Sequence, residues 1–186
     1  MRLFVAIDLD DIARQAIAQT QRRMADALDT DRALKWVSPA RMHLTLAFLG
    51  EISPPAVPAV VHALSLNVDV RPFAAIFQNA GVFPPRGAPR VLWLGVAGGA
   101  SEIIDTQRVV AGRLTGAGVT LERRPFHPHL TLARWRSSRP AAAARALAGA
   151  PHTPVARMNV DHVTLYESRL TAGGPVYTAL ARATLT

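Results

Sequence analysis

The pentapeptide His43-Leu44-Thr45-Leu46-Ala47 returns unchanged as His129-Leu130-Thr131-Leu132-Ala133, 86 residues (129 − 43) further along the chain. Successive side chains of an extended strand point to opposite faces, so histidine and threonine share one face and the two leucines the other. On such a strand the imidazole and the hydroxyl lie roughly 6 to 7 Å apart, which suits contact with one phosphate group from two sides. We therefore predict two strands that face each other and bring both imidazoles and both hydroxyls to one point.

Length and composition predict a folded protein that forms either one ordinary domain or one domain with two lobes. The chain has 186 residues, 49% of them hydrophobic, and no cysteine, which excludes disulfides, thiolate metal sites and cysteine nucleophiles. Residues 1–9 place an acid after only five apolar residues and lack a small-residue cleavage site, so they predict a first strand rather than a signal peptide. No stretch approaches the roughly 18 apolar residues of a membrane span. These features predict a cytoplasmic protein.

The charge of the chain favours an anionic partner such as nucleic acid. The formal net charge is +8 and the sequence pI is about 11.4. However, 20 of the 21 basic residues are arginine and only Lys35 is lysine, in a chain that is also rich in alanine. A compositional bias explains that usage as well as a ligand does, so the charge alone leaves both interpretations open.

Hydrophobic periodicity and turn residues predict an α+β protein. The patterns indicate helices over 11–28, 53–66, 101–115 and 140–149, and strands over 2–9, 34–37, 42–49, 73–83, 90–96, 126–135, 155–166 and 175–184. Short connections predict mainly antiparallel sheets with helices covering one side of each. The order of helix, motif strand, helix and strands recurs loosely, so we predict a pseudo-duplicated two-lobed body.

The residue types of the repeated motif fit the hydrolysis of a cyclic phosphodiester without a metal. Ring strain lowers the barrier for such a substrate, and water attacks opposite the leaving oxygen. The reaction needs one base and one acid on opposite sides of phosphorus, and histidine serves both roles near neutral pH. Thr45 and Thr131 could donate hydrogen bonds to the non-bridging oxygens.

The motifs and their flanks resemble one known family. The paired His-x-Thr-Leu segments are typical of the 2H phosphoesterase superfamily. Four segments resemble its bacterial and archaeal RNA 2′,3′-cyclic phosphodiesterases, also called 2′-5′ RNA ligases: Lys35-Trp36-Val37, residues 43–50, residues 126–134 and Leu165-Tyr166-Glu167-Ser168. The resemblance covers nearly the whole chain.

That resemblance implies a two-lobed fold with a central cleft and outer helices. It also implies opening of RNA terminal 2′,3′-cyclic phosphates to 2′-phosphates without metal or cofactor. Some members join tRNA halves through a 2′-5′ bond without ATP. The expected partners are RNA ends, nucleoside 2′,3′-cyclic phosphates and tRNA halves, and we expect a monomer that does not bind membranes.

The same resemblance assigns residues to the reaction. It implies that His43 is the proton donor to the leaving 3′ oxygen and His129 the acceptor that activates water, with Thr45 and Thr131 completing the motifs. The sequence does not fix this polarity, and ligation would reverse it. Arg134 follows the second motif as in close relatives and is a candidate for phosphate binding. It lies an odd number of positions from His129, however, so a regular strand would turn it away.

Other side chains are weaker candidates for substrate binding. His127 stands where relatives often carry a basic residue, and it could aid phosphate binding or be structural. Phe48 is a substrate-binding candidate by resemblance, but it shares the parity of Leu44 and Leu46, which favours the core. Four further aromatic residues could stack a base or pack in the core: Trp36, Phe83, Trp93 and Trp135.

The sequence also allows three alternatives to an RNA 2′,3′-cyclic phosphodiesterase. His43, His127 and His129 could form a three-nitrogen zinc site, although Pro128 stiffens that pair and the threonines would have no role. The fold could be an RNA or nucleotide-binding module without catalysis, although arginine or lysine would bind phosphate better than neutral imidazoles. A third alternative is another cyclic or 2′-5′ phosphodiester substrate, selected by loops 84–89 and 137–139.

Overall fold

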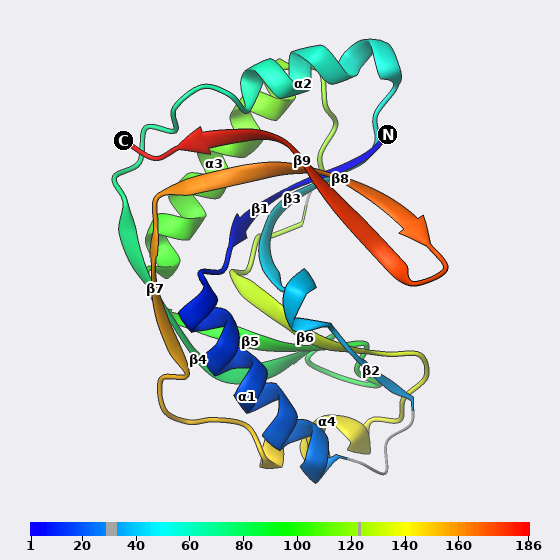
Figure 1. The fold of residues 1–186 in the computed structure, drawn as a ribbon. Coiled ribbons are helices and arrows are strands. Elements are labelled where there is room, and N and C mark those ends of the chain that lie inside the picture. The colour runs from blue at the N-terminus through cyan, green and yellow to red at the C-terminus, as the bar shows by residue number, and fades with distance from the viewer. Residues whose placement is uncertain (29–32, 123) are drawn as a thin grey trace.

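A computed structural model describes residues 1–28, 33–122 and 124–186, which fold into two antiparallel sheets (Figure 1). The first sheet has the order β3-β1-β8-β9, and the second has the order β2-β6-β5-β4-β7. The strands are β1 (Arg2–Asp8), β2 (Leu34–Trp36), β3 (His43–Glu51), β4 (Phe73–Phe83), β5 (Val91–Gly98), β6 (His129–Trp135), β7 (Ala156–Val160), β8 (His162–Thr171) and β9 (Gly174–Thr184). This architecture confirms the predicted fold class.

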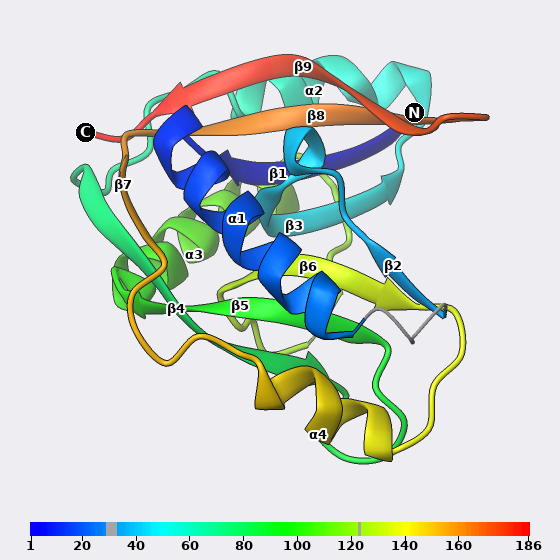
Figure 2. The same ribbon diagram turned by 60° about the horizontal axis from the view of Figure 1, so that its bottom comes forward.

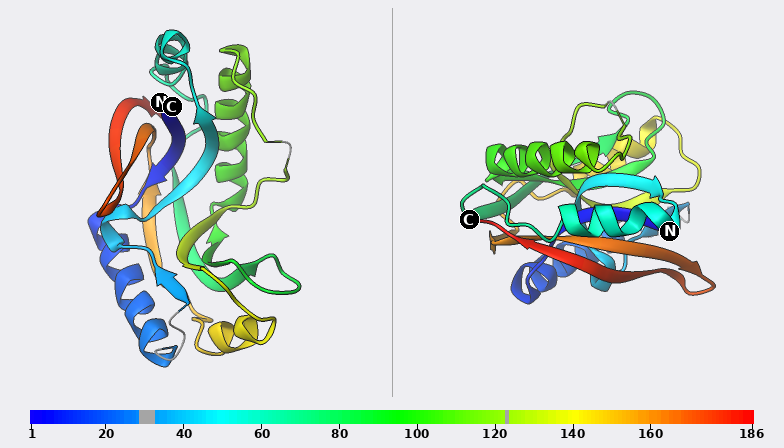
Figure 3. Two further views of the ribbon diagram at one scale, coloured as in Figure 1. Left: turned by 90° about the vertical axis from the view of Figure 1, so that its right-hand side faces the viewer. Right: turned by 90° about the horizontal axis from the view of Figure 1, so that it is seen from above.

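The two long helices each follow a strand of one sheet and pack on a strand of the other. Helix α1 (Asp11–Ala27) follows β1 of the first sheet but packs on β7 of the second, whereas α3 (Ala100–Gly116) follows β5 of the second sheet and packs on β3 of the first. Figure 3 shows α1 and α3 on opposite sides of the molecule. The shorter helices α2 (Val57–Ala63) and α4 (Ala141–Ala148) contact α3 and β4, respectively. This exchange ties the two sheets together.

Helix α1 is fixed at its start and along its buried side. The Asp10 carboxylate accepts the backbone N–H of Ala13, which is the usual role of an N-cap aspartate. Further along, the buried Gln21 amide donates to the carbonyl oxygens of Val37 at 2.7 Å and Leu132 at 3.0 Å. Because Leu132 belongs to the second motif strand, this amide holds that strand against the helix.

The core confirms the prediction that the leucines of both motifs point away from the histidines and threonines. The leucines of both motifs are buried in a single cluster of apolar side chains that draws on both sheets. The histidines and threonines of both motifs are only half-buried. The two faces of each motif therefore separate as alternation predicts. In the part of the chain that the structure describes, no helix is both long enough and apolar enough to cross a membrane.

The predicted strand over 155–166 is wrong. The chain forms two strands there, β7 and β8, and they belong to different sheets. The break falls at Asp161, whose carbonyl accepts the N–H of Leu185 and whose side chain meets His162. Apolar residues alternate with polar ones up to Val160, and the adjacent polar residues Asp161 and His162 then shift the alternation by one position. No glycine or proline stands there, and the prediction ran one strand through this shift.

Two other predicted elements are shorter than expected. The strand predicted over 126–135 begins only at His129, because Pro125 and Pro128 have no N–H to donate to a ladder. The helix predicted over 53–66 is a 3₁₀ turn, Pro54–Ala56, followed by the seven-residue α2. A second 3₁₀ turn, Pro39–Arg41, leads directly into β3.

Candidate active site

The two motif strands come together where the sheets meet. Strand β3 is the edge of the first sheet, and it contacts β6 of the second; Figure 2 shows the two strands next to each other. A cavity of about 580 Å³ is lined by Thr45 from the first motif and His129 from the second. The charge of Arg134 also influences the pKa of both His43 and His129. The repeated motifs therefore contribute to one site.

Both imidazoles are held in the same way. The Nδ1–H of His43 donates to the carbonyl oxygen of Arg41 at 2.9 Å, and the Nδ1–H of His129 donates to that of His127 at 2.8 Å. A carbonyl can only accept, so the proton of each neutral ring lies on Nδ1. In each ring Nε2 is then left to give or take a proton.

The rings of the two histidines pack against different aromatic groups. His43 stacks on Phe4 at a centroid distance of 4.8 Å and meets the edge of Tyr177 at 5.3 Å. His129 lies edge-on to Phe83 at 5.1 Å. Burial lowers the pKa of both imidazoles below the ordinary value, while the backbone carbonyl that each one contacts raises it in part. Burial therefore favours the neutral form of each ring over its protonated form.

A carboxylate distinguishes the two histidines. Asp8 on β1 is the cross-strand partner of His43, whereas Gly95 on β5 is the cross-strand partner of His129. Asp8 raises the pKa of His43, against the larger effect of burial. The second histidine has no equivalent: His127 and Arg134 both lower the pKa of His129.

Two hydroxyls hold the Asp8 carboxylate. The hydroxyl of Tyr166 donates to Oδ1 and that of Thr164 donates to Oδ2, each at 2.7 Å. Burial, with the help of Asp8, raises the pKa of Tyr166 to about 12, so the phenol stays a donor. His162 also lies 3.6 Å from Oδ2. Sequence reasoning did not single out Asp8, although its alternation with Phe4 and Ala6 along β1 places these three on one face.

A bulge at the same position of each motif changes which residues face the site. In the first sheet Ala6 pairs with Thr45 and Val5 with Ala47, so Leu46 is an extra residue. In the second sheet Trp93 pairs with Thr131 and Leu92 with Ala133, so Leu132 is an extra residue. An extra residue reverses the alternation of all that follow.

The reversed alternation exposes Phe48 and Arg134, the fifth residue after each histidine. The parity argument for a buried Phe48 is therefore wrong: the side chain is 58% exposed and lines the cavity. The argument that a regular strand turns Arg134 away also fails, because β6 is not regular. Arg134 is exposed and close enough to affect both imidazoles.

The remaining aromatic candidates separate into the cavity and the core. Phe83 lines the cavity, and Trp93 packs between Phe83 and His127. Trp135 is only 8% exposed and belongs to the core, so its role in base stacking is ruled out; Trp36 is half-buried. His127 is exposed, and it lines the cavity as well as orienting His129 through its carbonyl.

The zinc alternative has no site in this structure. Among residues 1–28, 33–122 and 124–186, no three side chains of the metal-binding types are grouped so that they could hold an ion. The candidate loop 84–89 borders the cavity through Pro84. More of the wall comes from five residues before the second motif: Leu121, Glu122, Arg124, Pro125 and Phe126. Ser137 and Arg139 do not line it.

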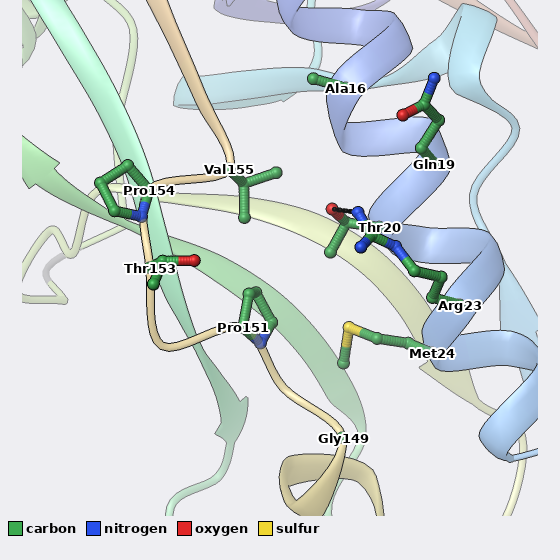
Figure 4. A pocket seen from close by; sticks show the side chains of 10 residues that line it. All are labelled: Ala16, Gln19, Thr20, Arg23, Met24, Gly149, Pro151, Thr153, Pro154 and Val155. Atoms are coloured by element: carbon green, nitrogen blue, oxygen red, sulfur yellow. Dashed lines mark hydrogen bonds between the residues drawn. The ribbon is translucent and has the colours of Figure 1, made fainter.

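A second cavity, of about 310 Å³, lies between α1 and residues 149–155 (Figure 4). Arg23 donates to the hydroxyl of Thr20 there at 3.5 Å. Its lining includes no histidine, aspartate or glutamate and no residue of either motif. This cavity therefore offers no acid and base, and the chemistry of the molecule belongs to the cavity between the motif strands.

Comparison with known proteins identifies the family of this chain. A family model described as the 2′-5′ RNA ligase superfamily matches residues 5–171. Proteins named RNA 2′,3′-cyclic phosphodiesterase align with the chain: one from Aeropyrum pernix is 34% identical over 85% of this chain and 90% of its own, and one from Archaeoglobus fulgidus is 32% identical over 95% and 96%. The crystal structure of E. coli LigT complexed with 3′-AMP has a TM-score of 0.78 at 29% identity, covering 100% of this chain and 98% of that one. The chain belongs to the 2′-5′ RNA ligase superfamily.

Proposed function

We propose that this protein hydrolyses the 2′,3′-cyclic phosphate at the end of an RNA chain to a 2′-phosphate, without a metal. The proposal rests on a matched pair of imidazoles on two strands that meet beside one cavity. Each has Nδ1 bonded to a carbonyl and Nε2 left for proton transfer; His129 lines the cavity, and the strand of His43 lines it through Thr45. The relatives named RNA 2′,3′-cyclic phosphodiesterase support the same reaction.

The reaction needs two proton transfers, one from the attacking water and one to the leaving 3′ oxygen on the opposite side of phosphorus. Nε2 of His129 takes a proton from water as the water oxygen attacks phosphorus. The bond from phosphorus to the 3′ oxygen breaks, and Nε2 of His43 gives its proton to that oxygen. The phosphate remains on the 2′ oxygen, and the two imidazoles exchange protonation states.

Asp8 supports the assignment of His43 as the donor. The donor must carry a proton before the reaction, and only His43 has a carboxylate as its cross-strand partner. Tyr166 and Thr164 keep that carboxylate in place by their hydrogen bonds. His129 has no such carboxylate, and both His127 and Arg134 lower its pKa, which keeps its Nε2 unprotonated and able to accept a proton.

The groups around the two histidines suit a phosphate with a nucleoside attached. Arg134 supplies a positive charge that acts on both imidazoles. Thr45 lines the cavity, and Thr131 follows His129 by two residues on β6; both hydroxyls would donate to the non-bridging oxygens. The exposed ring of Phe48 and the half-buried ring of Phe83 line the cavity and could stack a base, and His127 adds a further polar group.

Ligation would use the same groups, with the 5′ hydroxyl of a second RNA in place of water. His129 would take the proton of that hydroxyl as its oxygen attacks phosphorus, the bond from phosphorus to the 3′ oxygen would break, and His43 would protonate that oxygen, which leaves a 2′-5′ phosphodiester. RNA ends, including tRNA halves, are the partners that this reaction requires. The family membership supports ligation as a second activity of the same site.

The proposal is tested by replacing each histidine. We expect His43→Ala and His129→Ala each to lower kcat for a nucleoside 2′,3′-cyclic phosphate by at least about a hundredfold, the usual contribution of a positioned acid or base. His62→Ala, at an exposed site on α2, is the matched control and should keep full activity. The melting temperature of each variant reports whether it folds.

A non-catalytic RNA-binding module predicts a different result. It would bind RNA ends but show no turnover in the wild type, and the two histidine variants would change only the dissociation constant. Full turnover in a folded His43→Ala or His129→Ala variant would also refute the acid–base assignment.

A further inference from the structure

We propose that Lys35 binds the phosphate that precedes the terminal nucleotide, so that the site selects RNA chains over cyclic mononucleotides. The inference rests on the proposed function and adds a second phosphate subsite to it. Arg134 lies beside the reacting groups, and Lys35 is its nearest neighbour on the adjacent strand.

The register of β2 and β6 puts Lys35 and Arg134 on one face of the second sheet. The two residues are directly paired, and both are exposed. The pair before them along β2, Leu34 with Trp135, is buried on the opposite face. Neighbouring strands lie about 4.8 Å apart, so the two cationic side chains leave the sheet close together.

That face is the one that carries the cavity. Val91 on β5 pairs with Arg134 from the other side, and Val91 lines the cavity together with His129. Across the three strands the row therefore runs from Val91 at the cavity, through Arg134, to Lys35 on β2. Since β2 is the edge of the sheet, this row leads from the reacting groups outward.

Two like charges opposite each other on neighbouring strands destabilise a sheet unless something relieves them. Within residues 1–28, 33–122 and 124–186, no carboxylate forms an ion pair with Lys35 or Arg134. A pair of phosphates relieves both charges at once. RNA ending in a 2′,3′-cyclic phosphate supplies such a pair, because its next phosphate lies one nucleotide away on the 5′ side.

The residue type supports the same role. Lys35 is the one lysine among 21 basic residues in a chain that otherwise uses arginine. Lysine is a compact charge on a flexible stem, which suits a phosphate whose position varies from one RNA to another. Arg134, beside the reacting groups, carries the rigid planar guanidinium, which suits a phosphate that must be held in one orientation.

The test compares two substrates in wild type and in Lys35→Ala. The substrates are cytidine 2′,3′-cyclic phosphate and the dinucleotide cytidylyl-cytidine 2′,3′-cyclic phosphate, which has one more cytidine and the internucleotide phosphate that links it. We expect Lys35→Ala to lower kcat/KM about tenfold for the dinucleotide, from the loss of one charged contact, and to leave the mononucleotide unchanged. Lys35→Arg should restore most of the dinucleotide activity, and Arg145→Ala, exposed on α4, is the control.

Salt dependence gives an independent reading. Log affinity falls with log salt concentration, and each phosphate contact to single-stranded nucleic acid contributes about 0.7 to the steepness of that fall. For the dinucleotide we therefore expect the slope in Lys35→Ala to be about 0.7 shallower than in the wild type. Equal losses on both substrates, or no loss on either, would refute the second subsite and leave the proposed function standing. A wild type that turns over neither substrate would refute both.

Discussion

The carbonyl groups of Arg41 and His127 decide what the two site histidines can do. Each accepts a hydrogen bond from Nδ1 of the histidine two positions later. Rotation of either ring would break that bond, so Nε2 of each keeps one direction. The repeated His-x-Thr pattern predicted the two histidines, but the carbonyls that orient them carry no mark in the sequence, because any residue supplies a carbonyl.

Asp8→Asn tests the assignment of His43 as the proton donor and His129 as the proton acceptor. Asp8 raises the pKa of His43, so its removal lowers that pKa further. If His43 is the donor, it must be protonated, and the alkaline limb of the kcat/KM profile moves to lower pH while the acid limb stays. The measurement is the pH profile on a nucleoside 2′,3′-cyclic phosphate.

Asp105→Asn, on the exposed side of α3, is the matched control for loss of one carboxylate. A shift of the acid limb instead, with the alkaline limb unchanged, would mean that His43 is the base and would reverse the assignment.

At the scale of elements, the bulges decide which candidates reach the site. Alternation alone predicted correctly the faces of His43, Thr45 and the leucines, because the strand is regular that far. It failed for Phe48 and Arg134, which lie beyond the extra residue. A bulge depends on the register with the neighbouring strand, and no glycine marks either one, so a single strand's sequence cannot reveal it.

The support under His129 also depends on a neighbouring strand. Gly81 on β4 is paired with Trp93 on β5, and a Cβ at Gly81 would overlap the indole ring. Trp93 in turn packs against His127 and His129. The absence of a side chain at Gly81 therefore makes room for the ring that backs the second histidine.

Gly81→Ala should consequently destabilise the protein by about 1–3 kcal/mol, the usual cost of overpacking, and lower kcat as the indole moves. Gly112→Ala is the control within the same chain. It lies exposed in α3 with open space around its Cα, so alanine there should raise stability by up to about 1 kcal/mol. Thermal unfolding of both variants measures the difference, and an unchanged melting temperature for Gly81→Ala would contradict the packing role.

At the scale of the molecule, the site exists because two sheets meet. Composition and element order predicted a duplicated α+β body with two sheets, and the structure has one. The crossing between β7 and β8, and the exchange of α1 and α3 between sheets, were not predicted. Both depend on contacts between segments distant in the sequence, and local periodicity does not record which sheet a segment joins.

Burial of both imidazoles where the sheets meet makes the stability of the fold depend on pH. Both pKa values are lowered in the folded state from the ordinary value of 6.5. As the pH falls through that value, the unfolded chain binds protons that the folded chain does not, so stability decreases. We expect the melting temperature to fall between pH 7.5 and pH 5.5, and to fall less in the double variant His43→Gln/His129→Gln. Equal slopes in the two proteins would contradict the burial argument.

The central claim is that two histidines on repeated strands open a cyclic phosphate without a metal. The most direct measurement incubates the purified wild type with cytidine 2′,3′-cyclic phosphate and excess chelator, and identifies the product by ³¹P NMR. We expect the wild type to convert the substrate to cytidine 2′-phosphate at the same rate with and without chelator. No turnover, loss of turnover with chelator, or a 3′-phosphate product would contradict it.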